Sequence, residues 1–425
     1  MFHIDIRHGI AYFYKDKLYR NASYLVMSNL VISITGFLFW VIAARLYEPS
    51  DIGMASVLIS MMAFFSIFAV SGFDVTSIRF LPSMDDEEGG KLISTSFLFA
   101  IAISLTLSTA FILLIDLFAP SISILKSPIY GLMFIVSSVS FCVFYLLNGM
   151  FIARMRSDLV LLKGSLQGAL KVIFLPFLII AGGFGIYLSY ALSVIVGLLL
   201  SIFLIVRLYS KISLCFDFDV LKKTLVFLSG NYISSIFSQL PNLLFPIIIL
   251  NMISGADAAY FYMPWHMFFV FFGFIGPINA AFLMEGSYDE KEKEIEMGEV
   301  KAIKLCSLVV LGGLVLFLVF GRFILSLFGA RYANADNLLY VLAVSLVPAA
   351  INQIYLTLKN IRKEMKILTS LNMLIYSSSL VLGTLLIPSF GILGIGYGWF
   401  IGQSLGTVWI GLESCRHHIR RRIRA

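Results

Sequence analysis

Residues 44–58, ARLYEPSDIGMASVL, join two long apolar runs through a short polar break. The run before the break covers about 21–45 and the run after it covers about 52–78. A helix needs about 20 residues to cross the hydrocarbon core of a bilayer, so each run is long enough to span a membrane. The break itself combines an apolar helix end, a turn-forming cluster with acidic residues and the start of a new helix. The stretch therefore predicts two membrane-spanning helices joined by a short connection.

The same pattern continues along the 425 residues of the chain, which is 60% hydrophobic and only 13% charged. A soluble domain cannot bury that much apolar surface, so we predict an all-α polytopic membrane protein. Twelve apolar stretches are long enough to be membrane spans. They cover 21–45, 52–78, 92–117, 129–152, 159–180, 185–207, 224–250, 257–284, 302–328, 337–358, 366–387 and 391–412.

Basic residues are concentrated in alternate connections between these spans. Most of the 31 Lys and Arg residues lie in one set of loops, which includes Arg154, Arg156, Lys163, Lys359, Arg362, Lys363 and Lys366. This is the positive-inside bias, and it predicts that both termini are cytoplasmic. The external connections are short and carry no soluble domain. That argues against a membrane-embedded glycan polymerase or ligase and favours a transporter whose function lies between its helices.

An internal repeat relates the two halves of the sequence. Residues 251–265, NMISGADAAYFYMPW, show the same arrangement as 44–58 when Gly255 is aligned with Glu48, an offset of 255 − 48 = 207. The offset also brings Lys91 to GEVKAIK (298–304), and ARMRSDL (153–159) close to NIRKEMK (360–366). We therefore predict two six-helix halves, 1–210 and 211–425, the second with a short basic tail. Because six is even, the halves are parallel copies, and the predicted substrate path lies between them.

With these features the chain resembles the polysaccharide-transporter branch of the MOP superfamily, the O-antigen-type flippases. The resemblance rests on the twelve spans and on LYEPSDIGMASV (46–57), GFDVTSIRFLPS (72–83) and LFGARYANADNLLYVLAVS (327–345). It implies a MATE-like fold with a central cavity. It also implies a substrate, an oligosaccharide linked to undecaprenyl or dolichol pyrophosphate, that moves across the cytoplasmic membrane by alternating access for cell-surface polysaccharide synthesis. The sugar and the carrier lipid stay open.

Lys171 is the main candidate for a substrate contact. It lies in GALKVIFLPFLII (168–180), eight residues beyond Lys163, which is about 12 Å along a helix and near the middle of the bilayer. An uncompensated lysine there costs about 3 kcal/mol, so we expect it to face a hydrated cavity or a counter-charge such as a pyrophosphate. Two alternatives are that it snorkels toward the cytoplasmic headgroups or pairs with Asp74.

Three further ionisable residues are candidates. Arg79 is either an anchor at the membrane interface or a phosphate contact at the inward mouth of the path. Asp74 lies deeper in the same span and either pairs with a basic group or binds a cation. His266 sits near the middle of the eighth span, where it either couples proton movement to transport or hydrogen-bonds a neighbouring helix. The coupling ion, H⁺ or Na⁺, stays open.

Polar stripes follow one face of two helices. Asn231, Ser235, Ser238 and Asn242 are spaced by four, three and four residues on the seventh helix, and Asn29 and Ser33 begin a similar face on the first. The resemblance implies that these helices line the cavity, where such side chains bind sugar hydroxyls. Small polar residues also hold helices together, which is the alternative.

Several functions are not supported by the sequence. The four cysteines have no metal-ligand spacing, so neither a metal site nor a disulfide framework is predicted. There is no nucleotide-binding glycine loop, and we expect no catalytic residue, no cofactor and no nucleic-acid partner. A cation antiporter of the multidrug branch is the main alternative to the flippase, but the first span lacks the acidic residue that such antiporters typically carry. Expected partners are membrane lipids and proteins of polysaccharide assembly. The basic tail either contacts anionic lipid or an acidic assembly protein, or it only anchors the topology.

Overall fold

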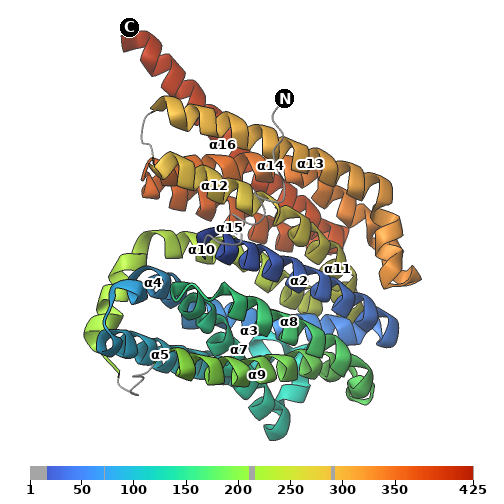
Figure 1. The fold of residues 1–425 in the computed structure, drawn as a ribbon. Coiled ribbons are helices and arrows are strands. Elements are labelled where there is room, and N and C mark those ends of the chain that lie inside the picture. The colour runs from blue at the N-terminus through green and yellow to red at the C-terminus, as the bar shows by residue number, and fades with distance from the viewer. Residues whose placement is uncertain (1–16, 71, 210–215, 289–291, 425) are drawn as a thin grey trace, which may run out of the picture. The chain divides into compact units, whose positions relative to one another are not determined.

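The structure is a computed structural model that describes residues 17–70, 72–209, 216–288 and 292–424. These residues form helices and turns, with no strand among them (Figure 1). Nine helical segments of the described chain are long and apolar enough to cross a membrane, and one of them, Ser157–Leu208, contains two of the predicted spans. The prediction of an all-α polytopic membrane protein is confirmed.

The chain divides into two compact units. Unit 1 contains residues 1–51 and 58–229, and unit 2 contains residues 52–57 and 230–425. The helices whose residues lie mainly in unit 1 are α2 (Lys17–Leu46), α3 (Pro49–Val70), α4 (Phe73–Phe80), α5 (Asp86–Leu113), α6 (Ile115–Phe118), α7 (Pro128–Ala153), α8 (Ser157–Phe174) and α9 (Gly182–Leu208). Three 3₁₀ segments accompany them, η1 (Leu81–Ser83), η2 (Pro120–Lys126) and η3 (Leu175–Ala181).

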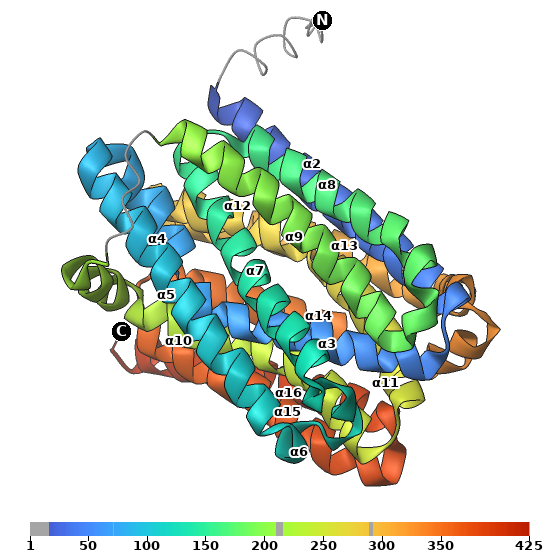
Figure 2. The ribbon, with the colours of Figure 1, turned by 90° about the horizontal axis from the view of Figure 1, so that it is seen from below.

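Within unit 1, α8 packs against both α2 and α9. Figure 2 shows α2 and α8 running side by side. Gly168 makes the close approach of these two helices possible, because a Cβ atom at this position would lie 2.5 Å from Oγ1 of Thr35 on α2. The small residue therefore fixes how near α8 comes to the first predicted span.

Unit 2 is built from the second set of helices. They are α10 (Phe218–Met252), which begins in unit 1, α11 (Gly255–Phe272), α12 (Ile275–Tyr288), α13 (Glu292–Phe328), α14 (Asp336–Ile361), α15 (Met365–Phe390) and α16 (Ile392–Arg424), with the 3₁₀ segment η4 (Ala330–Ala335). α16 packs against α15 and α14. A Cβ atom at Gly398 would lie 2.1 Å from the backbone nitrogen of Gly383, so α15 and α16 touch through their backbones.

Each of the twelve predicted spans falls on helical structure, but four of them are divided, among them 92–117 between α5 and α6 and 159–180 between α8 and η3. The span 52–78 is divided, because α3 ends at Val70 and Gly72, with φ of 73°, precedes α4. The left-handed conformation is available to glycine without steric cost and ends the helix. The span 257–284 is likewise divided between α11 and α12.

The repeat seen in the sequence is present in the backbone. α8 and α15 begin 365 − 157 = 208 residues apart, and each follows a turn in which a residue other than glycine has positive φ, Met155 at 55° and Lys363 at 58°. In both turns this residue donates its backbone N–H to the carbonyl three residues earlier, and the next residue donates to the carbonyl five residues earlier. The expected correspondence of ARMRSDL with NIRKEMK is therefore confirmed at the level of hydrogen bonds.

Candidate functional site

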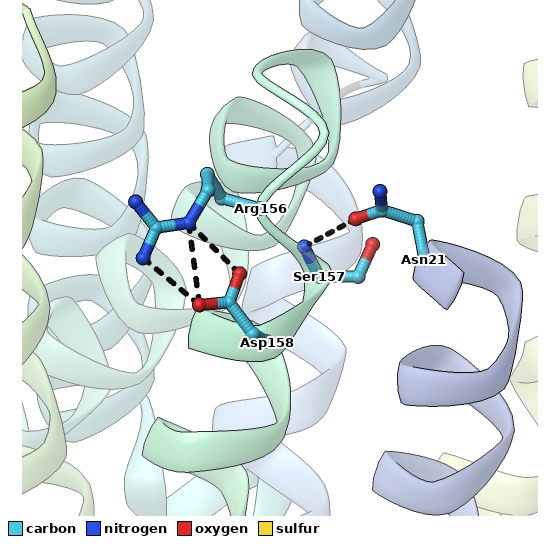
Figure 3. A network of polar contacts seen from close by, with 4 residues as sticks. All are labelled: Asn21, Arg156, Ser157 and Asp158. Atoms are coloured by element: carbon cyan, nitrogen blue, oxygen red, sulfur yellow. Dashed lines mark hydrogen bonds and ion pairs between the residues drawn. The ribbon is translucent and has the colours of Figure 1, made fainter. Parts of the chain in front are cut away.

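The first turn of α8 is tied to α2 by a side-chain cap. The backbone N–H of Ser157 donates to Oδ1 of Asn21 on α2 at 3.0 Å, and Asn21 is buried (Figure 3). Beside this contact Arg156 donates from Nε and Nη2 to both carboxylate oxygens of Asp158, at 2.8 to 3.2 Å. That hydrogen bonding raises the pKa of Arg156 above its ordinary value. These contacts fix where α8 begins, and so they fix the register of the residues along it.

A row of buried polar side chains runs along one face of α8. Lys163, Gln167 and Lys171 are spaced by four residues, which places them above one another on a helix, and they are only 1%, 6% and 4% exposed. The two lysines are about 12 Å apart along the helix axis. Nε2 of Gln167 lies 3.4 Å from Oγ of Ser193 on α9. Two cations and an amide therefore share one buried face of unit 1.

Lys171 is surrounded by aromatic rings instead of carboxylates. Its Nζ lies 5.8 Å from the ring centre of Phe39 on α2 and 5.7 Å from that of Tyr190 on α9. The ion pairs described in unit 1 belong to Lys91, Lys126, Arg154 and Arg156, and none joins Lys171 to Asp74. Cation–π contacts only partly replace the hydration that a buried ammonium group loses. Lys171 is thus a buried cation with no anionic partner among the described residues.

The structure corrects the prediction that Lys163 lies in a cytoplasmic loop. It lies inside α8, where its ammonium group donates to the backbone carbonyl of Phe144 on α7. Nζ also lies 3.9 Å from the ring centre of Phe144 and 5.8 Å from that of Phe151. A lone lysine near the end of an apolar run is indistinguishable from an interface anchor by hydropathy. The spacing of eight residues between Lys163 and Lys171 places both on the same helix face, and this was the signal in the sequence that could have indicated burial of Lys163.

Asp74 and Arg79 both lie on the short helix α4. Asp74 is half-buried and Arg79 is exposed, with its guanidinium carbon 5.6 Å from the ring centre of Phe80. The backbone of Asp74 packs against α7 at Gly149, where a Cβ atom would lie 2.4 Å from the Asp74 carbonyl oxygen. The roles predicted for these two residues stay predictions.

The polar stripes have mixed surroundings. On α2, Asn29 is exposed and Ser33 half-buried. On α10, Ser238 and Asn242 are half-buried, and Oδ1 of Asn242 accepts a hydrogen bond from Nε1 of Trp265 on α11 at 2.9 Å. The contact of Asn242 is thus one between helices. The side chains of Asn231 and Ser235 lie outside the described part of the structure.

His266 is half-buried on α11. Its ring stacks on Tyr262, one turn earlier, with the ring centres 5.7 Å apart and the planes inclined by 10°. This stacking orients the imidazole along its own helix. Its predicted role in proton coupling stays a prediction.

Lys359 on α14 is a second correction to the loop assignments, because it is buried at 4% exposure. It differs from Lys171 in having two carboxylate partners, Glu364 at 2.8 Å and Glu413 of α16 at 3.0 Å. Its charge is therefore compensated inside unit 2. This cluster connects the C-terminal end of α14 to the start of α15 and to α16, and it has the features of a structural ion pair.

The structure also contains a cavity on α15 and α16, but this cavity does not involve the residues that were predicted to bind substrate. The cavity has a volume of about 510 Å³ and is lined by Ile367, Leu374, Leu405, Val408, Trp409, Leu412 and Glu413, none of which was predicted to bind substrate. Within the described residues no group of His, Cys, Asp and Glu could hold a metal ion.

Comparison with solved structures defines the class of fold. The chain is 15% identical to the lipid II flippase MurJ in an inward closed conformation, with 93% of this chain and 87% of that chain covered and a TM-score of 0.73. It is 16% identical to an inward-facing multidrug resistance MATE family transporter of the MOP superfamily (94% and 95% covered, TM-score 0.68). It is also 16% identical to a MOP superfamily transporter from Pyrococcus furiosus with a binding pocket of reverse polarity (94% and 93% covered, TM-score 0.59). The fold is that of MOP superfamily transporters.

The family follows from the sequence itself. The model of the polysaccharide biosynthesis protein family matches residues 18–283, more than half of the chain, and the protein therefore belongs to this family. No curated protein sequence matches it significantly. It is a multi-pass membrane protein with the fold of MOP superfamily transporters, and the family resemblance found in the sequence is confirmed.

Proposed function

We propose that this protein is a flippase that moves a polyprenyl-pyrophosphate-linked oligosaccharide across the cytoplasmic membrane for cell-surface polysaccharide synthesis. The family membership supplies the pathway class, and the fold is one that transporters use. The observation that carries the proposal is Lys171, a buried cation in a membrane-spanning helix with no carboxylate partner in the described chain. An unpaired cation at this depth favours an anionic ligand such as pyrophosphate.

The residues of unit 1 take the charged part of the substrate in this mechanism. Lys171 attracts the pyrophosphate and orients it, while the polyprenyl chain remains in lipid. Asn29 and Ser33 of α2 and the polar face of α10 accept sugar hydroxyls, and Arg79 receives the phosphate at the cytoplasmic entrance. The two predicted halves, 1–210 and 211–425, then alternate between inward and outward access, and protonation of His266 or cation binding at Asp74 sets the direction.

A cation antiporter is the second candidate, because MATE transporters share the fold. Antiport of a cationic substrate requires membrane-embedded carboxylates, yet α2 contains no Asp or Glu and the buried unpaired charge of α8 is positive. Both observations favour an anionic substrate. We therefore rank the antiporter, and a glycan polymerase or ligase, below the flippase.

The test is a leaflet assay on the full chain in liposomes. A fluorescent lipid-linked oligosaccharide is placed in one leaflet, and its appearance in the other is followed with a membrane-impermeant quencher. We expect Lys171→Ala to slow transport at least about tenfold, because a charge-assisted contact to an anion is worth about 1.5–3 kcal/mol, and Lys171→Arg to retain part of it. Lys126→Ala is the matched control, since Lys126 is an exposed lysine of the same unit.

Two results would contradict the proposal at different points. If Lys171→Ala transports the substrate at the wild-type rate, Lys171 has a structural role only. The proposed contact between the flippase and the pyrophosphate would then be rejected. No transport by correctly folded wild type would reject the flippase and favour the antiporter, which is then tested by proton- or sodium-driven movement of a cationic dye.

A further inference from the structure

Unit 2 contains a buried cluster of amide and aromatic side chains on α14, α15 and α16 that the mechanism above does not use. Nδ2 of Asn352 donates to Oε1 of Gln403 at 2.9 Å, and Nε2 of Gln353 donates to the hydroxyl of Tyr376 at 3.1 Å. The ring of Tyr376 lies 5.9 Å from that of Trp399. These contacts join all three helices into one polar and aromatic group.

The positions of the cluster residues follow from the register of α15 and α16. Trp399 and Gln403 are one turn apart on α16, and Asn372 and Tyr376 are one turn apart on α15, so each pair lies on one helix face. The close backbone contact at Gly398 brings these two faces together. Asn372 also donates to Oγ of Ser234 on α10. The indole of Trp399 is further enclosed by Trp265, whose ring centre is 5.1 Å away.

Three polar atoms of this cluster have no hydrogen-bond partner among the described residues. They are Nε1 of Trp399, Nε2 of Gln403 and Oδ1 of Asn372, and their side chains are only 1%, 2% and 8% exposed. A buried polar atom without a partner costs about 1–3 kcal/mol. Buried polar atoms nearly always have a partner, so three unpaired atoms on the adjoining helices α15 and α16 require an explanation.

The chemistry of the three atoms indicates what could satisfy them. Two are donors and one is an acceptor, and the side chains of the cluster carry no charge. An anion would satisfy only the donors, and a cation only the acceptor. A hydroxyl group can donate and accept at once, so a ligand with several hydroxyls meets both needs. The faces of Trp399, Trp265 and Tyr376 add apolar surface of the kind that packs against the C–H face of a sugar ring.

We propose that the amide and aromatic cluster of Asn372, Tyr376, Trp399 and Gln403 is a binding site for an uncharged sugar residue of the transported glycan. The inference rests on the proposed flippase function and assigns one uncharged sugar residue to unit 2, in addition to the hydroxyl contacts proposed for α2 and α10, whereas the pyrophosphate is assigned to unit 1. The side chains are closed over the cluster in this conformation, so sugar enters when α15 and α16 change their contact during the transport cycle.

The experiment separates sugar binding from pyrophosphate binding on the purified full chain. The first probe is the free oligosaccharide that mild acid releases from the lipid-linked pool of the source cells, and the second is polyprenyl pyrophosphate without sugar. Both are titrated calorimetrically into wild type, Trp399→Phe, Gln403→Met and Lys171→Ala. Trp409→Phe is the matched control, because Trp409 lies on the same helix but lines the cavity and is not part of the cluster.

We expect Trp399→Phe and Gln403→Met each to weaken binding of the free oligosaccharide about tenfold, the equivalent of one good hydrogen bond. Binding of polyprenyl pyrophosphate should be unchanged in both, and the reverse pattern is expected for Lys171→Ala. The thermal midpoint of Trp399→Phe without sugar should change little, because removal of an unpaired buried donor offsets the cavity that the smaller ring leaves. Its Tm therefore shows that the loss of binding is not a loss of folding.

Two outcomes would overturn the sugar site. The first is that wild type binds no free oligosaccharide at millimolar concentration, and the second is that Trp399→Phe and Trp409→Phe bind it equally well. Either would leave ordered water as the partner of the three atoms. The flippase proposal fails by a different result, the absence of transport of the lipid-linked substrate by wild type, so the two failures can be told apart.

Discussion

The helices α8 of unit 1 and α15 of unit 2 follow the same turn but bury different chemistry. At an offset of 379 − 171 = 208, the positions of Lys163, Gln167 and Lys171 on α8 are occupied by Leu371, Ile375 and Ser379 on α15, all of them buried. The polar residues of α15 are one position further on, Asn372 and Tyr376, where α8 has Gly164 and Gly168. The two copies of the repeat therefore share the backbone of this turn, but the side chains that they bury differ.

The two units also treat a buried lysine differently. Lys171 of unit 1 lies near two aromatic rings and has no described carboxylate partner, whereas Lys359 of unit 2 has two carboxylates within 3.0 Å. Burial of a charge is costly in either case, but only the paired one is compensated within the protein. The difference separates a lysine whose charge is compensated by neighbouring helices from a lysine for which we propose an external anion as the partner.

The largest effect on stability is expected for Lys359→Met. Removing the cation leaves Glu364 and Glu413 as neighbouring carboxylates, and breaking a buried ion pair in this way costs about 3–5 kcal/mol. Glu364 is 36% exposed, so we expect a lower loss, about 2–4 kcal/mol in the free energy of unfolding. Unfolding in mixed detergent micelles measures it.

Lys126→Met serves as the control for this experiment. Lys126 pairs with Asp116 at 2.6 Å, but both side chains are at least half-exposed, so the loss should stay below about 1 kcal/mol. Equal losses for the two variants would show that Lys359 does not stabilise unit 2 through its buried ion pairs.

A smaller effect of opposite sign is expected for Lys171→Met. Methionine keeps the length and apolar stem of lysine and removes a charge that has no described counter-ion. We expect the free energy of unfolding to rise by about 1 kcal/mol, because the desolvation cost outweighs the lost cation–π contacts. Transport should nevertheless fall, which would separate function from stability at this residue. A loss of stability as large as that of Lys359→Met would contradict the comparison.

The sequence was sufficient to predict the class of fold and the repeat. Hydropathy identifies segments by their mean composition, and each predicted span falls on helical structure. The turns at 153–159 and 360–366 were recognisable because both combine basic residues with a helix start. Gly72 divides a span, but a single glycine inside an apolar run does not reveal its φ, so the break before α4 was missed.

The buried polar residues were predicted less well, for a physical reason. Whether Lys163 and Lys359 are interface anchors or buried groups depends on which helices pack against α8 and α14, and this is not encoded in local periodicity. Asn372 and Gln403 likewise read as ordinary polar residues of a helix. Lys171 was found because it lies too deep in its span for an interface anchor.

The last prediction tests whether the shared turn is strained equally in both units. Met155 and Lys363 have positive φ, which L-residues other than glycine adopt at a cost of about 1–2 kcal/mol because Cβ approaches the carbonyl oxygen. We compare Gly with Ala at each position, so that loss of the side chain is the same in both variants. We expect Met155→Gly and Lys363→Gly to be about 1 kcal/mol more stable than Met155→Ala and Lys363→Ala. A difference at only one of the two positions would show that the units share the hydrogen bonds of this turn but not its energy.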